Sequence, residues 1–155
     1  MELYGSLVNR MQENKRFCSK IEVGTYATVY SYSDRHAYEV VEVVDQDHVF
    51  VRQLDAKRAD DNGMSECQYY TYTSNAANPI HELKFSTRFG WREITHYGQW
   101  YIDKFEKKEL GWWWVDQALL SKVREAVAQG KTVKRYTGKW NISFGVADEY
   151  YDYSF

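Results

Sequence analysis

The sequence predicts a mostly β protein, and three observations support that fold class. Several segments alternate apolar and polar residues with a period of two, which is the pattern of half-buried strands. Aromatic residues make up 17% of the chain and 14 of them are tyrosines, a composition typical of β-rich proteins with rings at core edges and binding surfaces. The strand segments are short and separated by tight turns, with few helical segments between them.

The size and composition of the chain indicate a soluble globular protein. At 155 residues it is long enough for one domain, or one domain with a substantial insertion, around a genuine core. Hydrophobic residues at 44% and charged residues at 27% are ordinary values for such a protein. No apolar run approaches the roughly 18 residues required to cross a bilayer, and residues 1–4 lack the layout of a signal peptide. We therefore expect a cytosolic protein.

The N-terminal segment predicts a helix, and the segments after it predict strands. Residues 2–17 carry apolar side chains along one helical face, namely Leu3, Leu7, Val8 and Met11. From residue 21 the period changes to two, so residues 23–30 predict a strand that ends in a polar turn at 31–35. Further strands are predicted at 38–44, 48–54, 67–73, 81–87 and 91–94.

The strand at 38–44 and its neighbour at 48–54 are spaced as a hairpin, and so are the last two strands of that series. Residues 55–66 are polar and contain Asn62-Gly63, a strong turn signal because both residues tolerate positive φ. We expect a loop there. A second loop is expected at 74–79.

A helix is predicted from Asp116, a good N-cap residue, to Gly130, a good C-terminal residue. Its apolar face consists of Leu119, Leu120, Val123 and Val127. The aromatic stretch before it, up to Trp114, shows no regular period. Residues 139–144 predict a last strand, and residues 149–155 predict an aromatic tail packed on the barrel.

Five or six short strands with tight turns and few helices favour a small, strongly curved sheet or barrel. An SH3-like barrel with an N-terminal helix and an α-containing insertion is the first choice, and an OB-like barrel is the second. We expect a single domain over 1–155. It divides into a helix at 1–20, a barrel core at 21–94 and 140–155, and an aromatic and basic insertion at 95–139.

Three motifs carry a family resemblance: Ser33-Asp34-Arg35-His36-Ala37-Tyr38, Asp61-Asn62-Gly63-Met64-Ser65-Glu66 and the terminal Tyr150-Tyr151-Asp152-Tyr153-Ser154-Phe155. Together with residues 23–28 they resemble a group of uncharacterised small proteins of tailed phages and prophages. The resemblance covers 21–94 and 140–155 and implies a phage origin, hence the cytoplasm of a bacterial host. It implies no activity or catalytic residue. The insertion at 95–139 has no counterpart in that group.

The insertion concentrates aromatic and basic side chains. All six tryptophans lie between Trp91 and Trp140, and three are adjacent. Consecutive residues of a strand point to opposite faces, so at least one of the three adjacent indoles is expected at the surface unless both faces are covered. The predicted partner-binding residues are Trp100, Tyr101, Phe105, Lys107, Lys108, Trp112, Trp113, Trp114, Lys134 and Arg135. The alternative interpretation is that these rings pack the helix of the insertion onto the barrel.

Charge is divided unevenly along the chain. Residues 34–66 contain nine acidic and four basic residues, whereas residues 121–140 contain six basic and one acidic residue. Aromatic rings interleaved with cations also suit single-stranded nucleic acid, because bases stack on rings and cations neutralise phosphates. The acidic segment admits mimicry of phosphate charge, calcium binding or plain solvated loops. It lacks the spacing of an EF-hand.

No catalytic residue, metal site or cofactor is predicted. The four histidines are spread singly, without metal-ligand spacing. Cys18 and Cys67 are expected to be free and mostly buried, with Cys67 inside a strand. The cluster Asp34-Arg35-His36 contains groups capable of acid–base chemistry, but it is more simply a turn in which Asp34 caps backbone amides and Arg35 pairs with an acid.

We therefore expect a non-enzymatic phage accessory protein that binds a host macromolecule. The expected partner is a host protein, such as a defence nuclease or effector complex, blocked sterically in the manner of an anti-CRISPR inhibitor. The alternative is a small β-barrel that binds single-stranded nucleic acid. No membrane partner is expected.

Overall fold

The computed structural model describes residues 20–107 and 116–153. Among these residues strands account for 47% and helices for 16%, which confirms a mostly β protein. The chain divides into two compact units, which we call unit 1 (Met1–Glu93 with Lys139–Phe155) and unit 2 (Ile94–Gly138). Each end of unit 2 lies within one residue of the corresponding end of the insertion predicted at 95–139.

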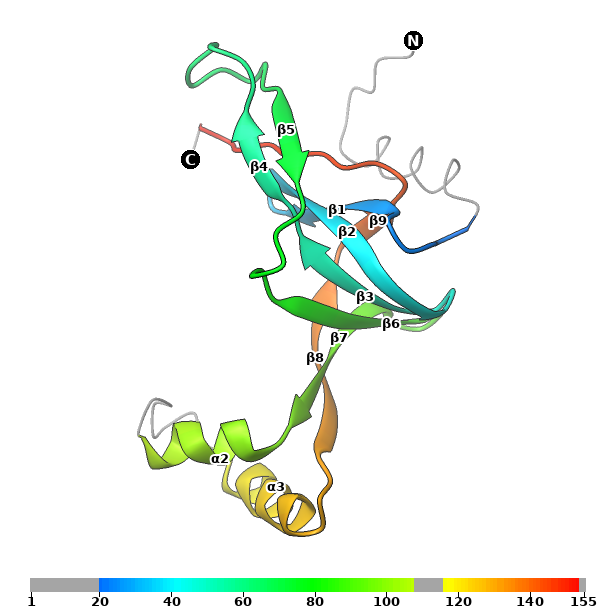
Figure 1. Cartoon of the computed structure of the whole chain (residues 1–155), viewed down its shortest axis with the longest axis vertical. Coiled ribbons are helices and arrows are strands. Elements are labelled where there is room, and N and C mark those ends of the chain that lie inside the picture. The colour runs from blue at the N-terminus through cyan, green and yellow to red at the C-terminus, as the bar shows by residue number, and fades with distance from the viewer. Residues whose placement is uncertain (1–19, 108–115, 154–155) are drawn as a thin grey trace. The chain divides into compact units, whose positions relative to one another are not determined.

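Nine strands and two helices are present in the described part of the chain. They are β1 (Tyr26–Ser31), β2 (Asp34–Asp45), β3 (His48–Gln53), β4 (Asp55–Arg58), β5 (Tyr70–Thr73), β6 (Ile80–Ser86), β7 (Gly90–Tyr97), α2 (Gln99–Glu106), α3 (Gln117–Ala128), β8 (Val133–Trp140) and β9 (Ile142–Phe144). Seven strands form one sheet in the order β8-β7-β6-β3-β2-β1-β9, while β4 and β5 pair only with each other (Figure 1).

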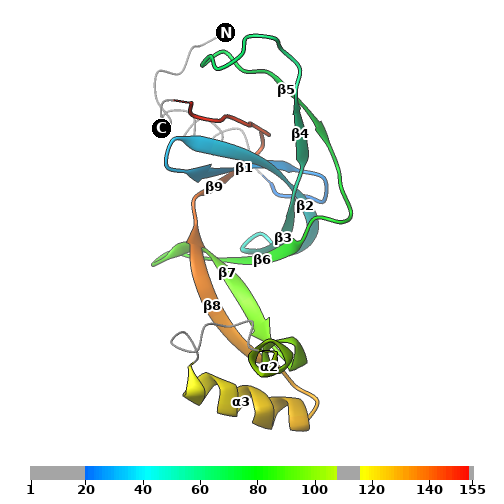
Figure 2. The same ribbon diagram turned by 90° about the vertical axis from the view of Figure 1, so that its left-hand side faces the viewer.

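The main sheet of unit 1 is antiparallel and curls into a half-barrel. β2 and β3 form the hairpin predicted at 38–54, and their pairing register shifts after Val40 and again after Val43. Each shift inserts an irregularity that bends the strand and increases its twist. Figure 2 shows β1, β2, β3 and β6 following one curved surface.

The core of unit 1 consists of residues from alternate strand positions, as the period of two predicts. Val49 of β3 lies opposite Leu83 of β6, and neither side chain has exposed surface. The complete buried cluster is Ala27, Val40, Val49, Val51, Leu83, Ile142 and Phe144. Burying side chains of this size stabilises the fold by roughly 1.5–3 kcal/mol each.

The last strand is longer than predicted and is divided in two. Only Asn141 separates β8 from β9. β9 pairs with β1, whereas β8 lies beside β7 at the other end of the sheet order. One continuous segment of chain therefore supplies both edge strands. Residues 133–138 escaped prediction because most of their side chains are exposed and no apolar alternation marks them.

Two loop predictions in unit 1 are wrong. Residues 55–58, expected in a loop, form β4, because the Tyr- and Thr-rich β5 offers a partner for their backbone groups. The polar turn expected at 31–35 is reduced to Tyr32 and Ser33. Asp34, Arg35 and His36 are strand residues of β2, since Ser31 already pairs with Asp34.

Cys67 is exposed, so the prediction of a buried strand thiol is wrong. β5 begins only at Tyr70, and Cys67 lies in the irregular segment before it. There the Cys67 amide donates to Ser65 Oγ and its carbonyl accepts from Asn62 Nδ2. Those side-chain bonds hold the backbone away from strand pairing. Cys18 and the helix expected at 2–17 lie outside the described residues.

Unit 2 contains the predicted helix α3 and an unpredicted helix, α2. The Asp116 side chain caps α3 by accepting a hydrogen bond from the Leu119 amide at 3.1 Å. α2 has no such signal, because Gly98 precedes it without a side-chain cap. The packing of its buried side chains against α3 stabilises α2 instead. The buried cluster of unit 2 consists of Tyr101, Ile102, Leu119, Leu120 and Val123.

Candidate functional site

Trp100 on α2 presents an exposed indole that is fixed in position. Its side chain is 43% exposed. The indole Nε1 donates a hydrogen bond to the His96 carbonyl at 2.9 Å, and the ring stacks on Tyr97 at 5.6 Å between centroids and 25° between planes. The polar atom of the ring is thus satisfied while much of the residue stays exposed, which is the usual state of an interface tryptophan.

A cation lies beside this indole. Lys104, one helical turn further along α2, places Nζ 5.6 Å from the Trp100 ring centroid. Residues four apart on a helix face the same side, so the pairing follows from sequence spacing. An ammonium group over an indole is attracted by about 0.5–1 kcal/mol at exposed sites. The pair presents an apolar surface with a positive edge.

Tyr101 and Phe105 have packing contacts in unit 2. Tyr101 is only 7% exposed and belongs to the buried cluster, and Phe105 packs against that cluster. Burial raises the pKa of the Tyr101 hydroxyl above its ordinary value. The Arg124 guanidinium lies 5.6 Å from the Phe105 ring centroid. These two rings hold α2 against α3 and thereby support Trp100.

Three predicted partner-binding cations lie among the described residues, namely Lys107, Lys134 and Arg135, and each has a different environment. Lys107 is exposed at the end of α2. Lys134 places its ammonium 5.9 Å from the centroid of Tyr136, itself 43% exposed. Arg135 forms an ion pair at 3.5 Å with Asp116, the residue that caps α3. Lys108, Trp112, Trp113 and Trp114 lie outside the described residues.

The three motifs of the phage resemblance meet on unit 1. The Asp152 amide donates to Asp34 Oδ1 at 2.7 Å. The Tyr151 amide and carbonyl both bond to the Gln68 side chain, at 3.0 and 2.7 Å. Arg58, beside the second motif, donates to the Tyr153 hydroxyl at 3.2 Å and to the Gly63 carbonyl at 3.0 Å. Segments far apart in the chain are therefore in direct contact on unit 1, an arrangement that the sequence did not predict.

Arg58 and Asp60 fix the loop that carries the second motif. Two guanidinium nitrogens of Arg58 donate to the two carboxylate oxygens of Asp60. The Tyr69 and Asn62 amides donate to the same carboxylate. The guanidinium and these amides hold the pKa of Asp60 well below its usual value. Asp60 therefore stays ionised and has a structural role in the loop.

Glu149 anchors the C-terminal tail to β2. One of its carboxylate oxygens accepts from the Ala37 amide at 3.0 Å, and the other lies 2.8 Å from Nδ1 of His36. This contact raises the pKa of His36 above its ordinary value of 6.5, against the opposing effect of burial. Next to it, Arg35 forms an ion pair with Asp148 at 2.9 Å. The expectation that Arg35 pairs with an acid is confirmed.

Two more histidines of unit 1 pair with glutamates. His48 Nε2 lies 2.6 Å from Glu82, and His81 Nδ1 lies 2.7 Å from Glu93. Sequence spacing could not find these pairs, because strand register brings the partners together from separate strands. In the described residues, no group of three or more histidine, cysteine, aspartate or glutamate side chains is arranged to hold a metal ion.

Comparison of the chain with protein-family models, curated proteins and solved structures finds no match. No helix within residues 20–107 and 116–153 has the length and apolar character needed to cross a membrane. The side chains described above are therefore the basis on which function is proposed.

Proposed function

We propose that this chain is a non-enzymatic phage accessory protein that binds a host protein through unit 2 and blocks it sterically. The proposed partner is a component of a bacterial defence system, a nuclease or effector complex of the CRISPR kind, met in the host cytoplasm. In this proposal unit 1 is a barrel of SH3-like type that serves as the scaffold.

The observation that carries the binding proposal is the exposed, hydrogen-bonded indole of Trp100. An exposed side chain that is already fixed loses little conformational entropy when a partner covers it, so more of the contact energy appears as affinity. Tryptophan is also among the residues most enriched at the centres of protein interfaces. Lys104 beside the ring adds a charge that orients an acidic partner surface.

A second candidate function is binding of single-stranded nucleic acid. The pairs Lys104–Trp100 and Lys134–Tyr136 each place a cation next to an exposed ring. A base stacked on such a ring contributes about 1–3 kcal/mol, with the cation neutralising a phosphate. Unit 2 contains eight basic and five acidic residues, a modest excess that fits either kind of partner.

An affinity pull-down from lysate of a bacterial host, with and without nuclease treatment, separates the two candidates. The proposal predicts that a component of a defence complex is retained after nuclease, is lost with Trp100→Ala, and is retained with the exposed control Tyr26→Ala of unit 1. Proteins that disappear on nuclease treatment would instead support the nucleic-acid function. That function also predicts oligonucleotide affinity that falls steeply with salt.

A further inference from the structure

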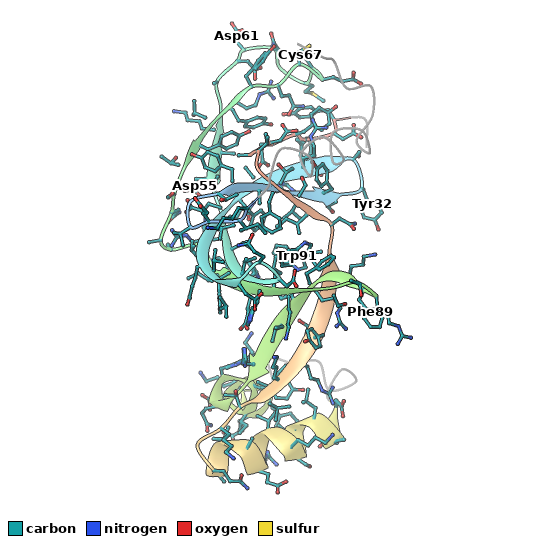
Figure 3. The ribbon with its side chains drawn as sticks, turned by 90° about the vertical axis from the view of Figure 1, so that its right-hand side faces the viewer. Tyr32, Asp55, Asp61, Cys67, Phe89 and Trp91 are labelled. Atoms are coloured by element: carbon teal, nitrogen blue, oxygen red, sulfur yellow. The ribbon has the colours of Figure 1, made fainter. Side chains whose placement is uncertain are left out.

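Tyr32 combines full exposure with an unfavourable backbone conformation. Its side chain is 97% exposed, and its φ is 48°, the only positive φ among the non-glycine residues described. It occupies the turn between β1 and β2, where Ser31 pairs with Asp34. Glycine adopts this conformation without steric cost, whereas a residue with a Cβ does not. The ring of Tyr32, shown in Figure 3 pointing away from the ribbon, packs against almost nothing in the chain.

A hollow lies directly beside Tyr32. Its volume is about 290 Å³, and it is lined by Tyr32, Ser33, Asp34, Tyr151 and Asp152. A second hollow, of about 220 Å³, is lined by Met64, Ser65, Glu66, Tyr150, Asp152 and Tyr153. Asp152 lines both hollows. We call this combined feature of unit 1 the tyrosine–carboxylate surface.

The tyrosine–carboxylate surface is held in shape by the contacts of the tail. Asp34 accepts the Asp152 amide at 2.7 Å, and the Gln68 side chain bonds to both backbone groups of Tyr151. The rings of Tyr151 and Tyr153 meet edge to face with centroids 4.8 Å apart. A partner would therefore meet a preorganised surface, which limits the entropy lost on binding.

The charged side chains described in this lining are all acidic. They are Asp34, Asp152 and Glu66, and none of the described residues that line either hollow is a lysine or arginine. Two described cations that contact tyrosines of this surface are already paired, Arg35 with Asp148 and Arg58 with Asp60. Aromatic faces and carboxylates both attract cations. Within the chain the same chemistry is visible at Tyr150, where the Arg35 guanidinium lies 4.5 Å from the ring centroid.

We propose that the tyrosine–carboxylate surface binds a lysine- or arginine-bearing segment of a protein partner. A cationic side chain enters between Tyr32 and Tyr151, with Asp34 as its counter-ion. This surface belongs to unit 1 and is a different one from that around Trp100, so a partner of the proposed kind is contacted through two separate surfaces.

The test is titration of a fluorescent arginine–glycine repeat peptide with the full-length protein, followed by anisotropy. A glutamate–glycine peptide and a glycine–serine peptide are the controls. We expect Tyr32→Gly and Tyr151→Ala each to weaken binding of the arginine peptide by about 3- to 30-fold. Two exposed aromatic residues of unit 2 provide matched controls, and Trp100→Ala and Tyr136→Ala should bind as the wild type does.

Tyr32→Gly gives a second, independent readout, its melting temperature, because glycine adopts the positive φ of this position without steric cost. The proposal expects this variant to melt at or above the temperature of the wild type while binding the peptide more weakly. Equal binding by the wild type, Tyr32→Gly and Tyr151→Ala would overturn the proposal, since general attraction to an acidic protein would then suffice. The proposal would also be overturned if the wild type bound the arginine peptide no more tightly than the glycine–serine peptide.

Discussion

Arg35 and Tyr150 are joined through their backbones and their side chains at once. The two residues exchange backbone hydrogen bonds of 3.0 and 2.9 Å, which form an isolated antiparallel bridge. The Arg35 guanidinium also lies 4.5 Å from the Tyr150 ring centroid and pairs with Asp148 at 2.9 Å. The tail is thus attached to the first residues of β2 by contacts that no local sequence pattern encodes.

Replacing Arg35 tests this attachment. Arg35→Ala removes a half-buried cation from the Tyr150 ring and from the Asp148 carboxylate, so we expect the unfolding free energy to fall by about 1–3 kcal/mol. Urea denaturation measures it. Arg88→Ala is the matched control, because Arg88 also lies over a ring, Phe89, but at an exposed turn. Its effect should stay within about 0.5 kcal/mol. Equal effects of the two substitutions would contradict the assigned role of Arg35.

His36 makes the attachment of the tail dependent on pH. Its folded-state pKa is raised above 6.5 by the contact with Glu149. The stabilisation is therefore complete below the unfolded pKa and is lost as pH rises through the raised folded pKa. We expect the difference in unfolding free energy between wild type and His36→Gln to shrink as the pH rises above about 6.5, the ordinary pKa of histidine. A difference that stays constant, or that grows with pH, would rule out this coupling.

Asp116 is expected to stabilise unit 2 through its capping bond. Its carboxylate accepts the Leu119 amide, and this bond, with help from Arg135, holds the pKa of Asp116 below its ordinary value. Asp116→Ala should lower the unfolding free energy by about 1 kcal/mol. Asp116→Asn keeps a capping oxygen and should cost less. Thermal denaturation followed by circular dichroism compares the two, and an asparagine variant no better than alanine would refute the capping role.

Gly130 ends α3 in a conformation that favours glycine. Its φ is 72°, and the Lys131 amide donates back to the Ala126 carbonyl at 2.8 Å. An added Cβ would meet nothing within 4 Å, so Gly130→Ala measures backbone strain alone, about 1–2 kcal/mol. Gly138→Ala is the control, since Gly138 also has open space around it and lacks a positive φ. Similar melting temperatures for both variants would contradict the assignment.

Local patterns predicted the hairpin of β2 and β3 and the helix α3 from the sequence. The hairpin alternates apolar residues on either side of a short polar turn, and α3 begins at a capping aspartate and ends at a glycine. What escaped prediction depends on pairing between distant segments. β4 exists because β5 lies beside it, and α2 exists because Tyr101 and Ile102 pack on α3.

The candidate site, like the fold, was predictable only where it depends on local sequence spacing. The spacing of Trp100 and Lys104 placed them on one helical face once α2 was known. Nothing in the local sequence separated the exposed Trp100 from the buried Tyr101 next to it. The same is true of the pair His36–Glu149 and of the tyrosine–carboxylate surface, which exist only because the tail returns to the start of β2.

The central claim is that Trp100 is an interface residue, and one comparison tests it most directly. The affinity of the captured host protein should be measured for wild type and for Trp100→Ala, together with the melting temperature of each. We predict a loss of binding of about 2 kcal/mol or more, roughly 30-fold in Kd, with only a modest fall in melting temperature from the lost hydrogen bond and the lost stacking on Tyr97. Unchanged affinity, or a large loss of stability that accounts for the loss of binding, would contradict the claim.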